Sequence, residues 1–87
     1  MRKQYTKVLK EFFHEQVFRR RSDLGITQEE MAYRLAMSSR TYVELDHGKS
    51  CCSALTLALF LIYICADPIA FLNELQNAFE NTEIQAA

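Results

Sequence analysis

The sequence contains few residues that break helices. Among its 87 residues are two glycines, one proline and no tryptophan. A β-rich fold needs many tight turns, which glycine and proline supply, so their scarcity argues against such a fold. Hydrophobic residues make up 49% of the sequence, which is ample for one core, and the length suits one domain. We therefore predict an all-α fold in a single domain of residues 1–87.

The second half of the chain lacks basic residues. Residues 1–49 contain all ten Lys and Arg together with seven acidic residues, which gives a net charge of +3. Residues 50–87 contain four acidic residues and no Lys or Arg, which gives −4. An anionic partner should therefore bind the N-terminal half. The alternative is that these charges only keep helix faces in water.

The cysteines and histidines show no pattern typical of a catalytic or metal site. Cys51, Cys52 and Cys65 are odd in number and have no C-x-x-C spacing, which argues against a disulfide framework or a zinc site. His14 has no nucleophile nearby in sequence, and His47 precedes a glycine at a helix end. We expect free thiols in a reducing cytoplasm, no catalytic residues, no metal and no cofactor. Oxidant sensing by Cys51 and Cys52 is the alternative for the thiols.

One long apolar segment, residues 54–66, is too short to cross a bilayer. Its sequence, ALTLALFLIYICA, has no basic residue on its C-terminal side. Residues 1–10 are charged throughout and lack the apolar stretch of a signal peptide. We expect a buried helix here, no membrane partner and a cytoplasmic protein.

Helix signals divide the chain into five segments. Apolar residues three or four apart mark the first and last segments. Gly25 and Gly48 suit positions just after a helix end, and Thr27 begins a T-x-x-E capping box. Ser38 suits an N-cap, as does Asp67 before a proline. The predicted helices cover residues 4–24, 27–36, 38–48, 53–65 and 67–80, followed by a frayed tail at residues 81–87.

The second and third segments have the spacing of a helix-turn-helix. A tight turn at residues 36–38 separates two short helices, so that the first braces the second. Tyr42 and Leu45 should face inward, which leaves short polar side chains facing outward. Such a helix fits the major groove of DNA, which is about 12 Å wide.

The residues around this turn resemble the Cro/repressor family, also called the xenobiotic-response-element type. Residues 25–32, GITQEEMA, resemble the family signature G-x-T-Q-x-x-x-A. The same register continues at Ser38, Thr41, Leu45, Asp46, Gly48 and Lys49. The resemblance covers about residues 17–72. It implies a compact five-helix, lambda-repressor-like domain, here with an extended first helix. It also implies a homodimer that binds operator DNA and regulates transcription, as repressors of phage or bacterial type do.

The resemblance also implies roles for single residues. Gln28 corresponds to a phosphate contact, while Ser39, Arg40 and Glu44 correspond to positions that read base edges. Arg40 suits guanine and Glu44 suits the amino group of cytosine. The full set of implied DNA-binding residues is Gln28, Ser38, Ser39, Arg40, Thr41, Val43, Glu44 and Lys49. Arg21 and Asp46 correspond to an ion pair that ties the first helix to the third.

The sequence departs from the family pattern at several positions. Ala36 stands where the family most often has glycine, which costs about 1 kcal/mol if that residue is left-handed. Acidic residues in the third segment should weaken attraction to phosphates. The fourth segment is apolar where the family is polar, at Leu55, Leu59 and Ile62.

Two arrangements would cover this extra apolar surface. One is a second subunit, which predicts a homodimer through the C-terminal half. The other is the long first helix of the same chain. The acidic, apolar C-terminal half also leaves an alternative function open, namely a protein-interaction module that keeps the fold without binding DNA.

Overall fold

The computed structural model describes residues 2–86, and the side chains of residues 2–82. Within this part the chain is helical and contains no strand, which confirms the predicted all-α fold class. No helix in it is long and apolar enough to cross a membrane. The elements are α1 (Arg2–Leu24), α2 (Gln28–Arg34), α3 (Ser39–Asp46), α4 (Ala54–Leu59), the π-helical turn η1 (Phe60–Ile64) and α5 (Pro68–Ala86).

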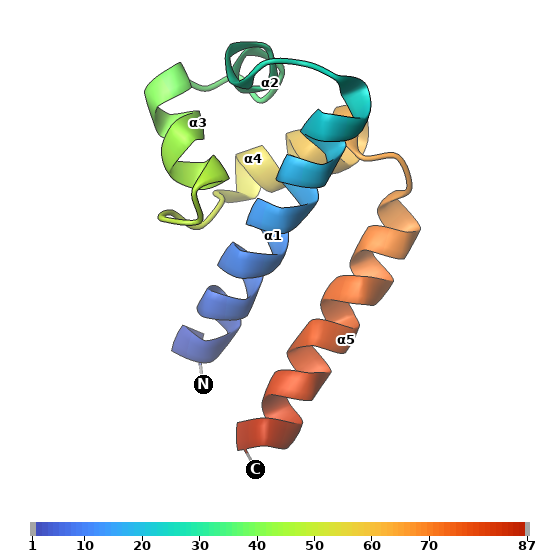
Figure 1. Cartoon of the computed structure of the whole chain (residues 1–87). Helices are drawn as coiled ribbons and strands as arrows, with labels where there is room; N and C mark the ends of the chain where they lie inside the picture. Colours follow the sequence, from blue (N-terminus) through green and yellow to red (C-terminus); the bar gives the residue numbers. More distant parts are fainter. Residues whose placement is uncertain (1, 87) are drawn as a thin grey trace.

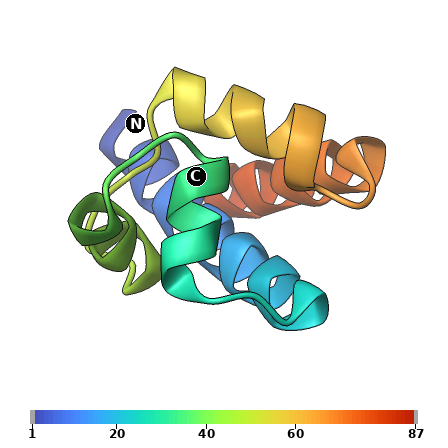
Figure 2. The ribbon, with the colours of Figure 1, turned by 90° about the horizontal axis from the view of Figure 1, so that it is seen from above.

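The two long helices, α1 and α5, lie side by side and run in opposite directions, so the start of α1 and the end of α5 meet at one end of the domain (Figure 1). Edge-to-face aromatic pairs join them: the ring centroids are 5.1 Å apart in both Tyr5–Phe79 and Phe12–Phe71. Seen from above, α4 and η1 form one continuous rod along an edge of the domain (Figure 2). The short helices α2 and α3 pack against each other, and α3 packs against α1.

Every helix contributes side chains to a single core. Phe13 of α1 packs against Phe60 of η1 and Phe71 of α5, with ring centroids 5.2 and 6.4 Å away. The buried apolar residues are Phe13, Val17, Met31, Ala32, Leu35, Tyr42, Leu45, Phe60, Ile64, Phe71 and Leu75. Both short helices of the predicted helix-turn-helix are therefore fixed to the core by their inner faces.

The predicted N-caps at Thr27, Ser38 and Asp67 are present, and Ser53 caps α4 in the same way. The side chains of Thr27, Ser38, Ser53 and Asp67 each accept a hydrogen bond from the backbone N–H three residues later, at 3.1–3.2 Å. These local bonds satisfy N–H groups that the first turn of a helix leaves without partners. They explain why each of these helices begins where it does.

Three helices end with the same pair of backbone hydrogen bonds. After α1, α2 and α3, two N–H groups fold back to carbonyls of the last turn, in the pattern of a Schellman motif. The residue at the centre of each motif is left-handed, with φ of 66° at Gly25, 56° at Ala36 and 72° at Gly48. The turn between α2 and α3 therefore has the geometry that suits glycine, with alanine in its place.

The helix ends differ from the prediction in two places. The regular part of the fourth helix stops at Leu59 and continues as the π-helical turn, where the Cys65 N–H donates to the Phe60 carbonyl at 2.7 Å. Arg20 of α1 donates to the Ile64 carbonyl at 2.7 Å, which satisfies the end of this turn. The tail from residue 81 was expected to fray; α5 extends through these residues as far as Ala86, and no glycine or proline follows Pro68 to end the helix earlier.

Replacing Ala36 with glycine should stabilise the fold. Glycine removes the steric cost of a left-handed alanine, about 1–2 kcal/mol, but adds entropy to the unfolded chain. The expected net gain is about 0.5–1 kcal/mol, or a rise of roughly 2–8 °C in Tm. Gly25→Ala is the matched control, because a Cβ there meets nothing within 4 Å and the change adds only left-handed strain. Calorimetry should show opposite shifts, and an Ala36→Gly protein that melts below wild type would contradict the account.

Candidate nucleic-acid interface

The third helix has one buried face and one exposed face. Tyr42 and Leu45 point into the core, with 0% and 3% of their surfaces exposed. Ser39, Arg40 and Glu44, which the resemblance assigned to base reading, are all exposed. Because α3 is anchored through its inner face, these three side chains project from a fixed backbone.

A buried carboxylate fixes the C-terminal end of α3. Asp46 is 5% exposed, and its Oδ1 accepts a hydrogen bond from the Tyr42 hydroxyl at 3.2 Å. Burial raises the pKa of Tyr42 above its ordinary value, and the charge of Asp46 adds to that rise, so the hydroxyl keeps its proton and donates. The other oxygen, Oδ2, lies 3.8 Å from Nη2 of Arg21. The predicted ion pair between α1 and α3 is therefore present.

Gln28 belongs to the same polar cluster. Its Nε2 donates to Oδ2 of Asp46 at 2.8 Å, so α2 is tied to α3 as well. The resemblance implies a phosphate contact for this residue, and in the structure its amide donates to the buried carboxylate. The Arg21 nitrogen lies 3.8 Å from the Asp46 carboxylate, which is long for a hydrogen bond. A buried charge needs closer hydrogen-bond donors, and the Gln28 amide is one of them. Arg21 also donates to the Ile26 carbonyl at 3.3 Å, beside the start of α2.

The remaining predicted contact residues surround the exposed face of α3. Ser38 caps the helix and donates to the Thr41 hydroxyl at 2.9 Å. Thr41 and Lys49 are exposed, whereas Val43 is half-buried, so only part of its side chain is accessible to a partner. Glu44 accepts a hydrogen bond from Ser50 at 3.5 Å, which connects α3 to the segment after it. All these residues lie on or next to one helix, as the sequence predicted.

Positive charge near α3 is limited by intramolecular pairing. Arg34 is paired with Glu30 at 3.2 Å, and Arg19 is paired with Glu15. Arg20 is bonded to the end of η1. Among the described side chains, those of residues 2–82, Arg40 and Lys49 make no ion pair or hydrogen bond. These two cations are therefore free to meet an anionic partner.

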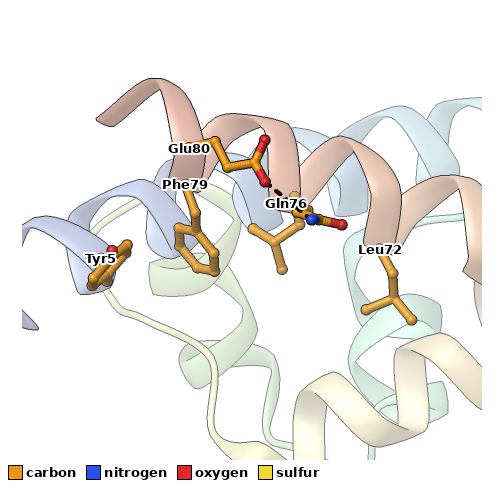
Figure 3. Close-up of a pocket in the computed structure, with 6 residues that line it drawn as sticks. Tyr5, Leu72, Gln76, Phe79 and Glu80 are labelled. Carbon is orange, nitrogen blue, oxygen red and sulfur yellow. Dashed lines mark hydrogen bonds between the residues drawn. The ribbon is translucent and has the colours of Figure 1, made fainter. Parts of the chain in front are cut away.

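A second exposed surface lies on the C-terminal half. Tyr5, Leu72, Leu75, Gln76, Phe79 and Glu80 line a mostly apolar groove between α1 and α5 (Figure 3). Leu72 is 50% exposed, and the neighbouring rod of α4 and η1 exposes Leu55 at 64% and Ile62 at 68%. The long first helix packs along α5 and leaves these side chains uncovered. The first helix of the same chain therefore covers the apolar fourth segment only in part.

Comparison with protein-family models, with curated proteins and with solved structures gives no match.

Proposed function

We propose that the chain binds double-stranded DNA in a sequence-specific manner and regulates transcription, with α3 in the major groove. One observation carries the proposal: Arg40 and Glu44, one turn apart on α3, are exposed together on the side opposite the buried Tyr42 and Leu45, and Ser39 is exposed in the first turn. Arginine donates two hydrogen bonds to O6 and N7 of guanine, and glutamate accepts one from N4 of cytosine. This face therefore offers both a donor and an acceptor for base edges.

The rigid anchoring of α3 in the domain supports the same proposal. The helix is held by core packing along its length, by Ser38 at its start and by the Asp46 cluster at its end. Side chains that start from a fixed backbone lose less conformational entropy on binding than those of a mobile loop. A helix of only eight residues gains this order from the rest of the domain.

The paired arginines predict a weak electrostatic contribution. We expect about three to five phosphates neutralised per subunit, so each subunit should contribute about −2.7 to −4.5 to the slope in a plot of log K against log salt concentration. Fluorescence anisotropy with a labelled duplex, titrated at several salt concentrations, measures this slope. Lys49→Ala should reduce its magnitude by about one. Binding that is absent even at low salt would contradict the proposal.

We further propose a homodimer formed through the C-terminal half. The exposed apolar side chains of α4, η1 and α5 lie on the part of the chain that carries no basic residue. A two-fold dimer would place two α3 helices about 34 Å apart, one turn of DNA. Sedimentation equilibrium at micromolar concentration should therefore show a species of twice 10.1 kDa.

A charge in the apolar groove should dissociate this dimer. Leu72→Asp introduces a carboxylate at a half-exposed position that lines the groove, and burying it in an interface is costly. Tyr33→Asp is the matched control, because Tyr33 is 81% exposed on α2. The first variant should sediment as a monomer and the second as wild type. A wild-type protein that is only monomeric would reject the dimer.

The alternative function is a protein-interaction module that uses the same fold. The observation that favours it is the exposed apolar groove on an acidic half of the chain. The salt titration separates the two proposals, because an interaction module without DNA binding gives no salt-dependent retention on duplex DNA or heparin.

A further inference from the structure

The N-terminal half of α1 carries lysines along one side of the helix. At 3.6 residues per turn, Lys3, Lys7 and Lys10 fall within roughly 60° of arc around the helix axis. We call these three residues the basic strip. Lys3 and Lys7 are exposed, and Lys10 is half-buried. Within the part of the chain whose side chains are described, none of the three makes an ion pair or a hydrogen bond.

The segment that follows α3 runs along this side of α1 (Figure 1). The His14 ring lies against Gly48, since a Cβ at Gly48 would be 3.5 Å from Cδ2 of His14. The Cys51 thiol donates a weak hydrogen bond to the Thr6 carbonyl, 4.0 Å away. Lys49 lies in the chain between these two contacts, which are about two helical turns apart on α1.

The strip therefore adjoins the proposed DNA-binding surface. His14 lies one turn after Lys10 on the same side of α1, and Thr6 directly precedes Lys7. The exposed Lys49, just after α3, is thus next to the basic strip. Together they form one surface of unpaired positive charge that begins at the end of α3 and continues along α1.

We propose that the basic strip binds the sugar-phosphate backbone of the duplex beside the base pairs that α3 reads. The inference rests on the proposed DNA binding and extends the contact from α3 to the first helix. From Lys3 to Lys10 the strip rises about 10 Å along α1. One strand of DNA places a phosphate every 3.4 Å, roughly, along the duplex axis. The strip is therefore long enough to meet about two to three phosphates.

The chemistry of the strip suits this partner. The lysine ammonium is a compact charge on a flexible stem, which attracts a phosphate without demanding a fixed geometry. Contacts to phosphate position a protein on DNA without reading its sequence. Glu11 is the one acidic residue among residues 2–14, so the strip retains a positive potential. In the C-terminal half of α1, by contrast, Arg19 and Arg21 are paired with carboxylates.

Anisotropy titrations with two labelled duplexes test the strip. One duplex ends at the motif selected by the protein, and the other adds roughly five base pairs of arbitrary sequence on each side, which exceeds the length of the strip. Wild-type protein should bind the longer duplex more tightly, with a salt slope that is steeper by about 1.8 to 2.7 per subunit.

The triple variant Lys3→Gln/Lys7→Gln/Lys10→Gln should lose this dependence on flanking DNA. Between about 50 and 200 mM salt, the affinity of wild type for the longer duplex should fall about 10- to 40-fold more per subunit than that of the variant. The preference of the variant for the motif over random DNA should be unchanged, because phosphate contacts carry no sequence information.

Matched single variants separate a local contact from a general loss of charge. Lys7→Gln removes one charge from the strip, whereas Arg19→Gln removes one on the roughly opposite side of α1, where it is paired with Glu15. Only Lys7→Gln should reduce the magnitude of the slope, by about 0.9. Circular dichroism checks that each variant keeps its helices.

The outcomes distinguish the strip from the proposed function itself. If wild type binds the motif but has equal affinity for both duplexes, or if the triple variant keeps the dependence on flanking DNA, the strip is overturned and the proposed DNA binding stands. Equal changes of slope for Lys7→Gln and Arg19→Gln would also overturn the strip. Wild-type protein that binds neither duplex at low salt would overturn both proposals.

Discussion

Replacing Asp46 with alanine should lower the free energy of unfolding by about 3 kcal/mol. The change leaves the Arg21 charge without its carboxylate, and it removes the acceptor of the buried Tyr42 hydroxyl and of the Gln28 amide. A buried group that loses its partner costs far more than a surface pair contributes. Urea denaturation followed by circular dichroism measures the loss as a lower midpoint with an unchanged slope.

Glu15→Ala is the matched control for this prediction. It breaks an ion pair with Arg19 in which both side chains are more than half exposed, so it should cost no more than about 0.5 kcal/mol. The double variant Arg21→Met/Asp46→Ala should lose less than the sum of its single variants, because the stranded charge is then removed. Equal losses for Asp46→Ala and Glu15→Ala would show that the cluster does not hold the three helices together.

Replacing Arg40 with alanine should weaken binding to a specific DNA site by about 1–3 kcal/mol and relax selectivity at one base pair. Arg40 is exposed on α3 and has no partner among the side chains of residues 2–82, so its guanidinium is available for guanine. The loss corresponds to a 5- to 150-fold rise in Kd, roughly, in an anisotropy titration. Stability should be almost unchanged, because the side chain is exposed.

Lys49→Ala separates base contacts from charge. Both variants remove one positive charge, yet Lys49 lies after α3, beside the sugar-phosphate backbone in the proposed arrangement. Its loss should weaken binding to all sequences alike and leave selectivity intact. If Arg40→Ala leaves affinity for the selected site unchanged, or behaves as Lys49→Ala does, the assignment of α3 to base reading is wrong.

Features set by neighbouring residues could be predicted from the sequence. The N-caps at Thr27, Ser38 and Asp67 depend on bonds that span three residues, and the left-handed ends at Gly25 and Gly48 depend on single backbone positions. The inward faces of α2 and α3 followed from their periodicity, but the apolar spacing of α5 also included Ile69 and Leu72, which are 73% and 50% exposed. The Arg21–Asp46 pair spans 25 positions, and it came from the resemblance rather than from local pattern.

Features set by tertiary contact could not be predicted in this way. Gln28 donates a hydrogen bond to Asp46, and Arg20 donates one to the Ile64 carbonyl. Tertiary packing brings these distant groups together, and polar groups shielded from water then form hydrogen bonds with each other. Nothing local in the sequence marked the π-helical turn. The exposure of Leu55 and Ile62 depends on where α1 packs. The apolar pattern alone could not decide whether α1 or a second subunit covers these side chains.

Selection from a random pool of duplex DNA at low salt tests the central claim most directly. Wild-type protein is used to enrich sequences over several rounds, and the affinity of the enriched site is then compared with that of the starting pool. The account predicts one enriched motif, with a G·C base pair whose identity matters less once Arg40 is replaced by alanine. A pool that remains random, with equal affinity before and after selection, would contradict it.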